Sequence, residues 1–192
     1  MRDFVRKESE GINQFDIEKF NIRGIEAEFT FSLGKDLPSR NEVYTVDEVI
    51  DAIEFFTPSI EICASRFEDT PVDVNLFLSD FGGHGFLILS DNVYTKDEIQ
   101  DINLEDIPVK MTKINAETGD KIVAAEGFGK DVLGSPLHSL AWLANHLARY
   151  TNVGLSKGHI ICTGTCTGLL PVSKQESYLA DFGPLGDVKV SF

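Results

Sequence analysis

The sequence has few basic residues, few cysteines and no long apolar run. Lysine and arginine number 17 against 31 aspartates and glutamates, which gives a net charge of −14. This deficit argues against binding to nucleic acid or an anionic membrane, where basic patches supply most of the affinity. The three cysteines, Cys63, Cys162 and Cys166, are too few and odd in number for a disulfide framework, which favours the cytoplasm. No apolar stretch approaches the roughly 20 residues of a membrane span, and the N-terminal residues lack the apolar core of a secretory signal.

Several common catalytic motifs are absent as well. There is no GxxxxGK[ST] phosphate loop, no nucleophile elbow and no second cysteine pair that would complete a zinc site with Cys162 and Cys166. Asp80-Phe81-Gly82 spells a kinase metal-binding motif, but no kinase glycine loop or catalytic loop accompanies it. These absences exclude the P-loop enzymes, the kinases and the usual serine hydrolases.

Short apolar and alternating segments dominate, and helices are few, which predicts a mainly β fold with peripheral helices (α+β) rather than a regular strand–helix alternation. Residues 1–22 are polar and weakly patterned and are expected to form an N-terminal tail, with 23–192 as one domain. Helices are predicted over 45–56, opened by a Thr45–Glu48 capping box and stopped by Pro58, and over 135–150, with Ser135 as cap. Strands are predicted over 25–33, 58–66, 107–114, 121–125, 158–165 and 187–192, and a strand–turn–strand unit over 74–89.

The stretch from Gly24 to Gly34, GIEAEFTFSLG, places Glu26 and Glu28 on one face of a strand with no lysine or arginine between them. Their Cα atoms are about 6.6 Å apart, and at that separation two charges repel by about 2.5 kcal/mol at an effective dielectric of 20. A solvated face disperses this repulsion, whereas a buried face needs protons or a divalent cation. Glu61, set among apolar neighbours, also needs a partner, either a shared metal ion or Arg66.

Five stretches together resemble the fumarylacetoacetate hydrolase superfamily, and within it the branch of 2-keto-4-pentenoate hydratases and 4-oxalocrotonate decarboxylases. They are IEAEFTFSLGKDLP, TVDEVIDAIEFFTPSIEICASR, VLGSPLHSLAWLANHLA, GHIICTGTCTGLLPV and ADFGPLGDVKVSF. The resemblance implies curled, multilayer mixed β-sheets like those of the fumarylacetoacetate hydrolase C-terminal domain, and a homo-oligomer.

The same resemblance implies that Glu26, Glu28 and Glu61 bind Mg²⁺ or Mn²⁺, and that Gly164 and Thr165 face the substrate. The implied reaction is the hydration of a small 2-oxo or 2-hydroxydienoic acid, such as 2-hydroxypenta-2,4-dienoate, through a metal-stabilised enolate. A decarboxylase or C–C hydrolase on the same metal site is a close alternative. A non-catalytic family member is a further one.

Two departures from the family pattern bear on catalysis. The family's N-terminal lysine, in a K-[IV]-G motif, has no counterpart here, so a shortened chain, a different mechanism or an inactive protein is expected. Asp80 matches a family aspartate, but Phe81 stands where the family has an amide, and His84 follows in a glycine turn. Asp80 and His84 are therefore the candidate catalytic residues. For His84 the alternatives are a substitute acid or base and an ordinary surface histidine.

Overall fold

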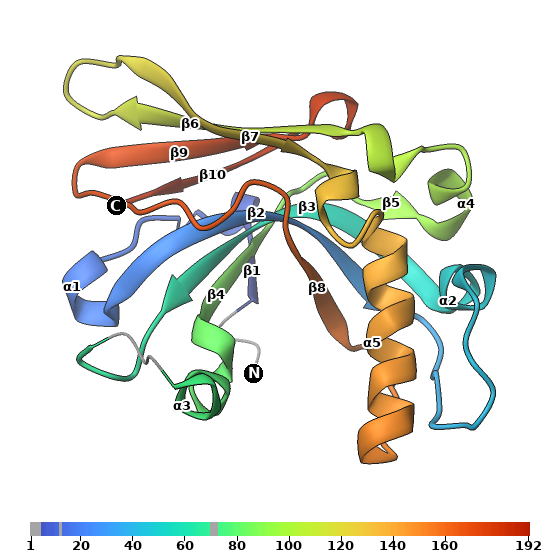
Figure 1. The fold of residues 1–192 in the computed structure, drawn as a ribbon. Coiled ribbons are helices and arrows are strands. Elements are labelled where there is room, and N and C mark those ends of the chain that lie inside the picture. The colour runs from blue at the N-terminus through green and yellow to red at the C-terminus, as the bar shows by residue number, and fades with distance from the viewer. Residues whose placement is uncertain (1–4, 12, 70–72) are drawn as a thin grey trace.

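The chain folds around two β-sheets, in a computed structural model that describes residues 5–11, 13–69 and 73–192 (Figure 1). All strand pairs are antiparallel except β1 with β4, so the larger sheet is mixed. The long strands β2 and β3 curve visibly in Figure 1, and the two sheets confirm the expected mainly β fold. In spatial order the larger sheet contains β1 (Val5–Lys7), β4 (His84–Leu89), β3 (Ile53–Ala64), β2 (Ile22–Leu33) and β8 (Ile160–Thr165), with β5 (Tyr94–Thr95) beside β3. The smaller sheet contains, also in spatial order, β10 (Asp187–Ser191), β9 (Glu176–Asp181), β6 (Pro108–Asn115) and β7 (Lys121–Phe128).

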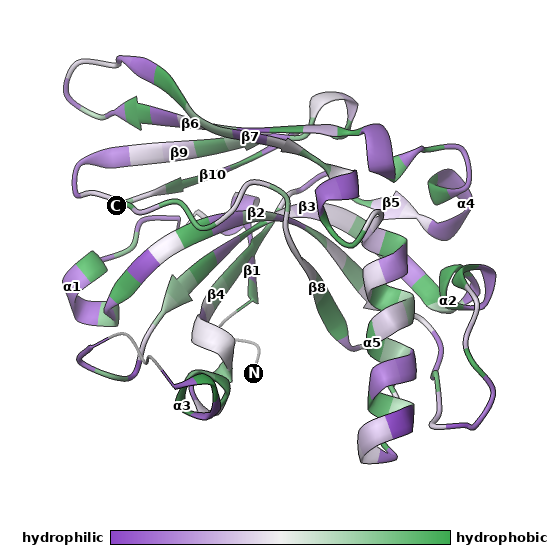
Figure 2. Ribbon diagram, in the orientation of Figure 1, coloured by the Kyte–Doolittle hydropathy of each residue, from purple (hydrophilic) through white to green (hydrophobic). Residues whose placement is uncertain are grey.

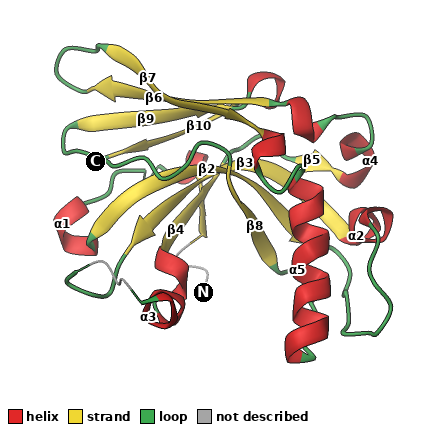
Figure 3. Cartoon of the chain, viewed as in Figure 1, coloured by secondary structure: helices red, strands yellow, loops and turns green. Residues whose placement is uncertain are grey.

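The helices lie around the sheets rather than between them (Figure 3). Among the described residues, no helix is both long enough and apolar enough to cross a membrane. The α-helices are α1 (Ile17–Phe20), α2 (Val46–Ala52), α3 (Val74–Ser79), α4 (Lys96–Ile99) and α5 (Pro136–Thr151). The 3₁₀ turns are η2 (Glu8–Glu10), η3 (Phe81–Gly83), η4 (Leu104–Asp106), η5 (Gly129–Asp131) and η6 (Gly183–Leu185).

The hydrophobic core includes one face of β2 and the inner face of the smaller sheet. Phe29 packs edge-to-face on Phe182 with ring centroids 5.3 Å apart, and Tyr178 and Val188 are fully buried in the same cluster. Figure 2 shows β4 coloured mostly as hydrophobic, in agreement with the burial of its residues. The residues of β2 that share the Phe29 face are all fully buried: Ile25, Ala27, Phe29, Phe31 and Leu33.

Helix α2 begins as predicted but ends early. The Thr45–Glu48 capping box is confirmed, since each side chain bonds the backbone N–H of the other residue. The helix ends at Ala52 instead of Phe56 because the following β-branched and aromatic residues pair with β2. Pro58 does not stop a helix; it lies inside β3, next to the end of the β3–β4 pairing at Ser59, where its missing N–H costs the ladder least.

Other predictions have mixed outcomes. Helix α5 and the β6–β7 hairpin are confirmed, although the Ser135 side chain makes no capping bond. The predicted strand at 74–79 is wrong: Asp73 caps a short helix there, accepting bonds from the backbone N–H groups of Asn75 and Leu76. β9 was missed.

The N-terminal segment does more than a tail would. Its described residues contribute β1 to the larger sheet and Phe15, which is 3% exposed, to the core. The division of the chain at residue 23 stays a prediction.

Candidate metal centre

Glu26, Glu28 and Glu61 lie on adjacent strands of the larger sheet. Glu26 and Glu28 are two residues apart on β2, and Glu26 pairs directly with Glu61 on β3, which puts their Cβ atoms about 5 Å apart. The face that they share is not open to solvent: Glu28 is 2% exposed, and Glu26 and Glu61 are half-buried. The structure thus brings the three predicted ligands together on a largely covered surface.

Burial and mutual repulsion control the protonation of this group. Burial, and then the neighbouring charge of Glu61, raise the pKa of Glu26. The same causes, with a smaller contribution from Glu26, raise the pKa of Glu28 well above its usual range, although a backbone hydrogen bond opposes the shift. Without a cation the cluster therefore favours bound protons.

The last two residues of β8, Gly164 and Thr165, hold Glu28 in place. The Gly164 N–H donates to Glu28 Oε2 at 2.9 Å, and Thr165 pairs with Glu28 across the strands. The backbone of Gly164 has φ of 105°, a conformation that favours glycine. Gly164 therefore positions a candidate ligand, while contact of Gly164 and Thr165 with substrate stays a prediction.

His84, not Arg66, is the partner of Glu61. His84 Nδ1 lies 2.5 Å from Glu61 Oε1, and its side chain is 36% exposed. The expected alternative, an ion pair between Arg66 and Glu61, is wrong because the Arg66 guanidinium binds Asp80 instead. His84 thus touches the carboxylate cluster, and its catalytic role stays a prediction.

Asp80 is deeply buried and fully engaged. Its carboxylate accepts hydrogen bonds from Ser65 Oγ at 2.9 Å, from the Arg66 N–H at 3.1 Å and from the Arg66 side chain. Burial acts to raise the pKa of Asp80, but these hydrogen bonds outweigh it and the pKa is lowered. The contacts tie the end of α3 to the end of β3, so they give Asp80 a positioning role, and its catalytic role stays a prediction.

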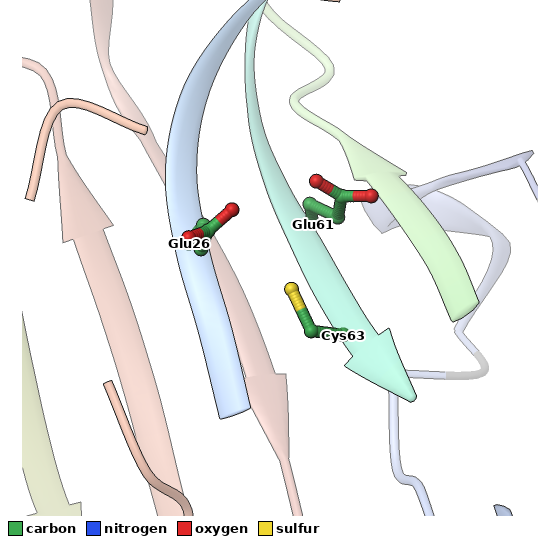
Figure 4. A group of neighbouring side chains, drawn as sticks. All are labelled: Glu26, Glu61 and Cys63. Carbon is green, nitrogen blue, oxygen red and sulfur yellow. The ribbon is translucent and has the colours of Figure 1, made fainter. Parts of the chain in front are cut away.

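Cys63 is a site residue that sequence reasoning missed. It follows Glu61 by two positions, so both side chains leave the same face of β3. Figure 4 shows its sulfur pointing toward the carboxylates of Glu26 and Glu61, and one candidate ligand atom from each of the three residues lies within 4.8 Å of the others. The i, i+2 spacing was the available signal.

A cavity of about 180 Å³ adjoins this cluster. It is smaller than the roughly 300–1,000 Å³ of drug-sized pockets, so it suits a small molecule. The wall includes Glu26 and Cys63 from the cluster, Asp80 and the glycines of η3, and one basic side chain, Arg23.

The described part of the chain supplies no lysine or arginine partner to the cluster. Within the described ranges, no lysine or arginine forms an ion pair with Glu26, Glu28 or Glu61. Carboxylate oxygens are the ligands that hard divalent cations prefer. The donor set therefore fits such a cation.

Comparison with known proteins identifies a family. The profile of the fumarylacetoacetate (FAA) hydrolase C-terminal family matches residues 14–188. The chain is 30% identical over 168 residues to 2-keto-4-pentenoate hydratase 1 of Dechloromonas aromatica (strain RCB), covering 88% of this chain and 59% of that protein. It is 28% identical over 181 residues to 2-oxo-hept-4-ene-1,7-dioate hydratase of Escherichia coli, covering 91% and 63%.

A solved structure is similar over the whole chain. The 4-oxalocrotonate decarboxylase from Pseudomonas putida G7, complexed with magnesium and adipate, superposes with a TM-score of 0.83 at 26% identity, covering 100% of this chain and 67% of that one. Measured against the two hydratases above, this chain spans only about 60% of their length. On the profile match and the shared fold, the chain belongs to the fumarylacetoacetate hydrolase C-terminal family.

Proposed function

We propose that this chain carries the metal centre of a hydro-lyase that hydrates a small 2-oxo or 2-hydroxydienoic acid, such as 2-hydroxypenta-2,4-dienoate. The observation that carries the proposal is the gathering of Glu26, Glu28 and Glu61, without a lysine or arginine partner in the described ranges, beside a small cavity. The similarity to two hydratases supports the reaction class.

Mg²⁺ or Mn²⁺ is the proposed ion, held by Glu26, Glu28 and Glu61, because all three offer hard oxygen ligands. The related decarboxylase of Pseudomonas putida G7 is complexed with magnesium in one structure and with calcium in another. A bound ion of this kind supplies Lewis-acid stabilisation of the negative charge that develops on the substrate.

The chain's own residues orient the ligands and move protons. Gly164 fixes one oxygen of Glu28. His84 is held by Glu61 through Nδ1, which leaves Nε2 as the ring nitrogen that carries a proton to or from the reacting carbon. Gly164 and Thr165 are proposed to contact the substrate at the end of β8.

Decarboxylation on the same site is the second candidate, favoured by the structural similarity to 4-oxalocrotonate decarboxylase. Loss of carbon dioxide and removal of a proton both leave negative charge on the same oxo-acid framework. Carbon dioxide release from a 2-oxo dicarboxylic acid separates the two reactions.

Arg23 is proposed to bind an anionic end of the substrate. It lines the cavity with Glu26. One of its terminal nitrogens donates to the Phe67 and Glu68 carbonyls, while Nε is buried without a hydrogen-bond partner in the described part of the chain. The guanidinium is thereby fixed at the wall of the cavity, where its charge can attract a substrate carboxylate.

Metal-dependent turnover tests the main proposal. Wild-type protein is expected to hydrate 2-hydroxypenta-2,4-dienoate with Mg²⁺ or Mn²⁺ and to lose the activity with a chelator. Metal at about 100 times its Kd should also stabilise the fold by about 2.7 kcal/mol, seen as a higher Tm. Glu28→Gln should abolish the Tm rise and lower turnover by about 100-fold or more, since losing even an outer partner of a ligand costs about 10–100-fold.

Glu126→Gln is the matched control, because Glu126 is exposed on β7 and pairs only with Lys110. Glu126→Gln should retain both the metal-dependent rise in Tm and the metal-dependent turnover. Unchanged Tm and zero turnover of the wild-type protein at millimolar metal would refute the proposal.

The pH dependence of stability gives a second test, made without metal. Because the folded-state pKa of Glu28 is raised above the usual 4.5, its stabilising contribution is complete below pH 4.5 and is lost as the pH rises through the folded-state pKa. Urea unfolding of wild type and Glu28→Gln from pH 5 to pH 8 should therefore show the variant gaining relative stability with pH. With excess Mn²⁺ at pH 8, the wild-type protein should instead be more stable than Glu28→Gln, because the ion binds only the intact site. Parallel pH curves for the two proteins would contradict the assignment.

Replacing Arg23 tests the anionic subsite. Arg23→Gln is expected to raise KM for a 2-oxo dicarboxylic acid by about 10–100-fold, the equivalent of one hydrogen bond to a charged group. KM for a monocarboxylic acid should change much less. Arg149→Gln on the exposed side of α5 is the control. Equal KM changes for both substrates would remove Arg23 from the recognition of the second carboxylate.

We also propose that the chain works as a homo-oligomer in the cytoplasm. β7 is an edge strand of the smaller sheet, and its Ile122 and Val123 are 61% and 50% exposed. Such an edge favours association.

Light scattering after gel filtration should give a mass above 21.2 kDa. Ile122→Glu should lower the measured mass, whereas Val153→Glu should not. A wild-type monomer at micromolar concentration would exclude this arrangement.

A further inference from the structure

The thiol of Cys63 occupies a place in the carboxylate cluster that the proposed reaction does not use. Ligand atoms of Glu26, Glu61 and Cys63 lie within 4.8 Å of one another. Atoms bound to one ion at about 2.0–2.3 Å lie at most about 4.6 Å apart. Small side-chain rotations therefore suffice to bring the sulfur and both carboxylates onto one ion (Figure 4).

The placement of Cys63 differs from that of the other two cysteines. All three are free thiols. Cys166 is 4% exposed and belongs to the hydrophobic core, and Cys162 lies against Thr30 Oγ1 at 3.8 Å. Cys63 is half-buried, lines the cavity and lies beside the carboxylates of Glu26 and Glu61. It therefore has both an approach route for an ion and a carboxylate neighbour.

The chemistry of sulfur makes this thiol selective. Oxygen ligands suit Mg²⁺ and Mn²⁺, whereas a thiolate prefers Zn²⁺ and other thiophilic dications. We propose that Cys63 joins Glu26 and Glu61 as a third ligand of one ion, used only when a thiophilic dication such as Zn²⁺, Co²⁺ or Cd²⁺ binds. The thiol then loses its proton to water in the cavity and forms one sulfur–metal bond, with no change in oxidation state. With Mg²⁺ or Mn²⁺ it remains a protonated thiol outside the ion's ligands.

This inference rests on the proposed metal centre and adds a second class of ion to it. The chain should discriminate between ions in a way that a site of three carboxylates alone would not. Thiophilic ions gain one bond from Cys63, and hard ions gain none.

Cd²⁺ and Co²⁺ titrations of the whole chain test the proposal. Wild-type protein is expected to show a thiolate-to-metal charge-transfer band in the near ultraviolet, with one sulfur per ion. Cys63→Ser should abolish the band and weaken Cd²⁺ binding by at least about tenfold, the lower end of what loss of a partner of a metal ligand costs. Mn²⁺ affinity, measured by electron paramagnetic resonance, should be unchanged in the same variant.

Cys162→Ala is the matched control and should keep the band. Circular dichroism checks that each variant folds. Alkylation of Cys63 in wild-type protein, mapped by mass spectrometry, should be slowed by Cd²⁺ and not by Mg²⁺, so the test does not depend on a variant alone.

Normal Mn²⁺ binding with no charge-transfer band, or with a band that survives in Cys63→Ser, would overturn the role of Cys63 and leave the proposed function intact. Mn²⁺ binding with a Cys63-dependent band but no turnover would support the role of Cys63 and remove the proposed reaction. Failure of the protein to bind any of these ions would overturn both.

Discussion

Repulsion among three carboxylates on a covered face of the sheet is the constraint around which this structure is organised. Glu26 and Glu61 face each other across β2 and β3, and Glu28, at 2% exposure, adds a third acid to the same surface. No lysine or arginine within the described ranges pairs with them. Since an uncompensated buried charge is expensive, the cluster must take up protons or a cation, and that requirement links the fold to metal chemistry.

The rest of the molecule keeps the acids close despite this repulsion. The opposite face of β2 packs into the core against the smaller sheet, so the strand cannot move away from its neighbours without exposing Phe29 and the residues around it. On the polar face, Gly164 and His84 each hold one glutamate. The ion pair of Asp80 with Arg66 joins the ends of α3 and β3 beside the cavity. Apolar burial thus stabilises an arrangement that electrostatics alone would disperse.

Several elements could be predicted because their signals are local. The alternation along β2, the Thr45–Glu48 capping box and the apolar face of α5 all depend on residues a few positions apart. Predictions failed where pairing with distant strands overrode local preference. Ile53–Phe56 continued a helical pattern but joined β3, and residues 74–79 read as a strand although Asp73 caps a helix there. The glutamates were found through a family resemblance as well as spacing, whereas the contact of His84 with Glu61 depends on β3–β4 pairing over 23 residues.

By itself the sequence determined the chemical character of the site: oxygen-rich, acidic, carried on strands and short of basic partners. It also determined which face of β2 is apolar, because side chains alternate along any strand. Only the tertiary structure decided that the acidic face is covered, that Arg66 serves Asp80 rather than Glu61, and that Cys63 joins the carboxylates. The physical reason is that burial and partner choice depend on the register between strands distant in sequence, which no short stretch of residues specifies.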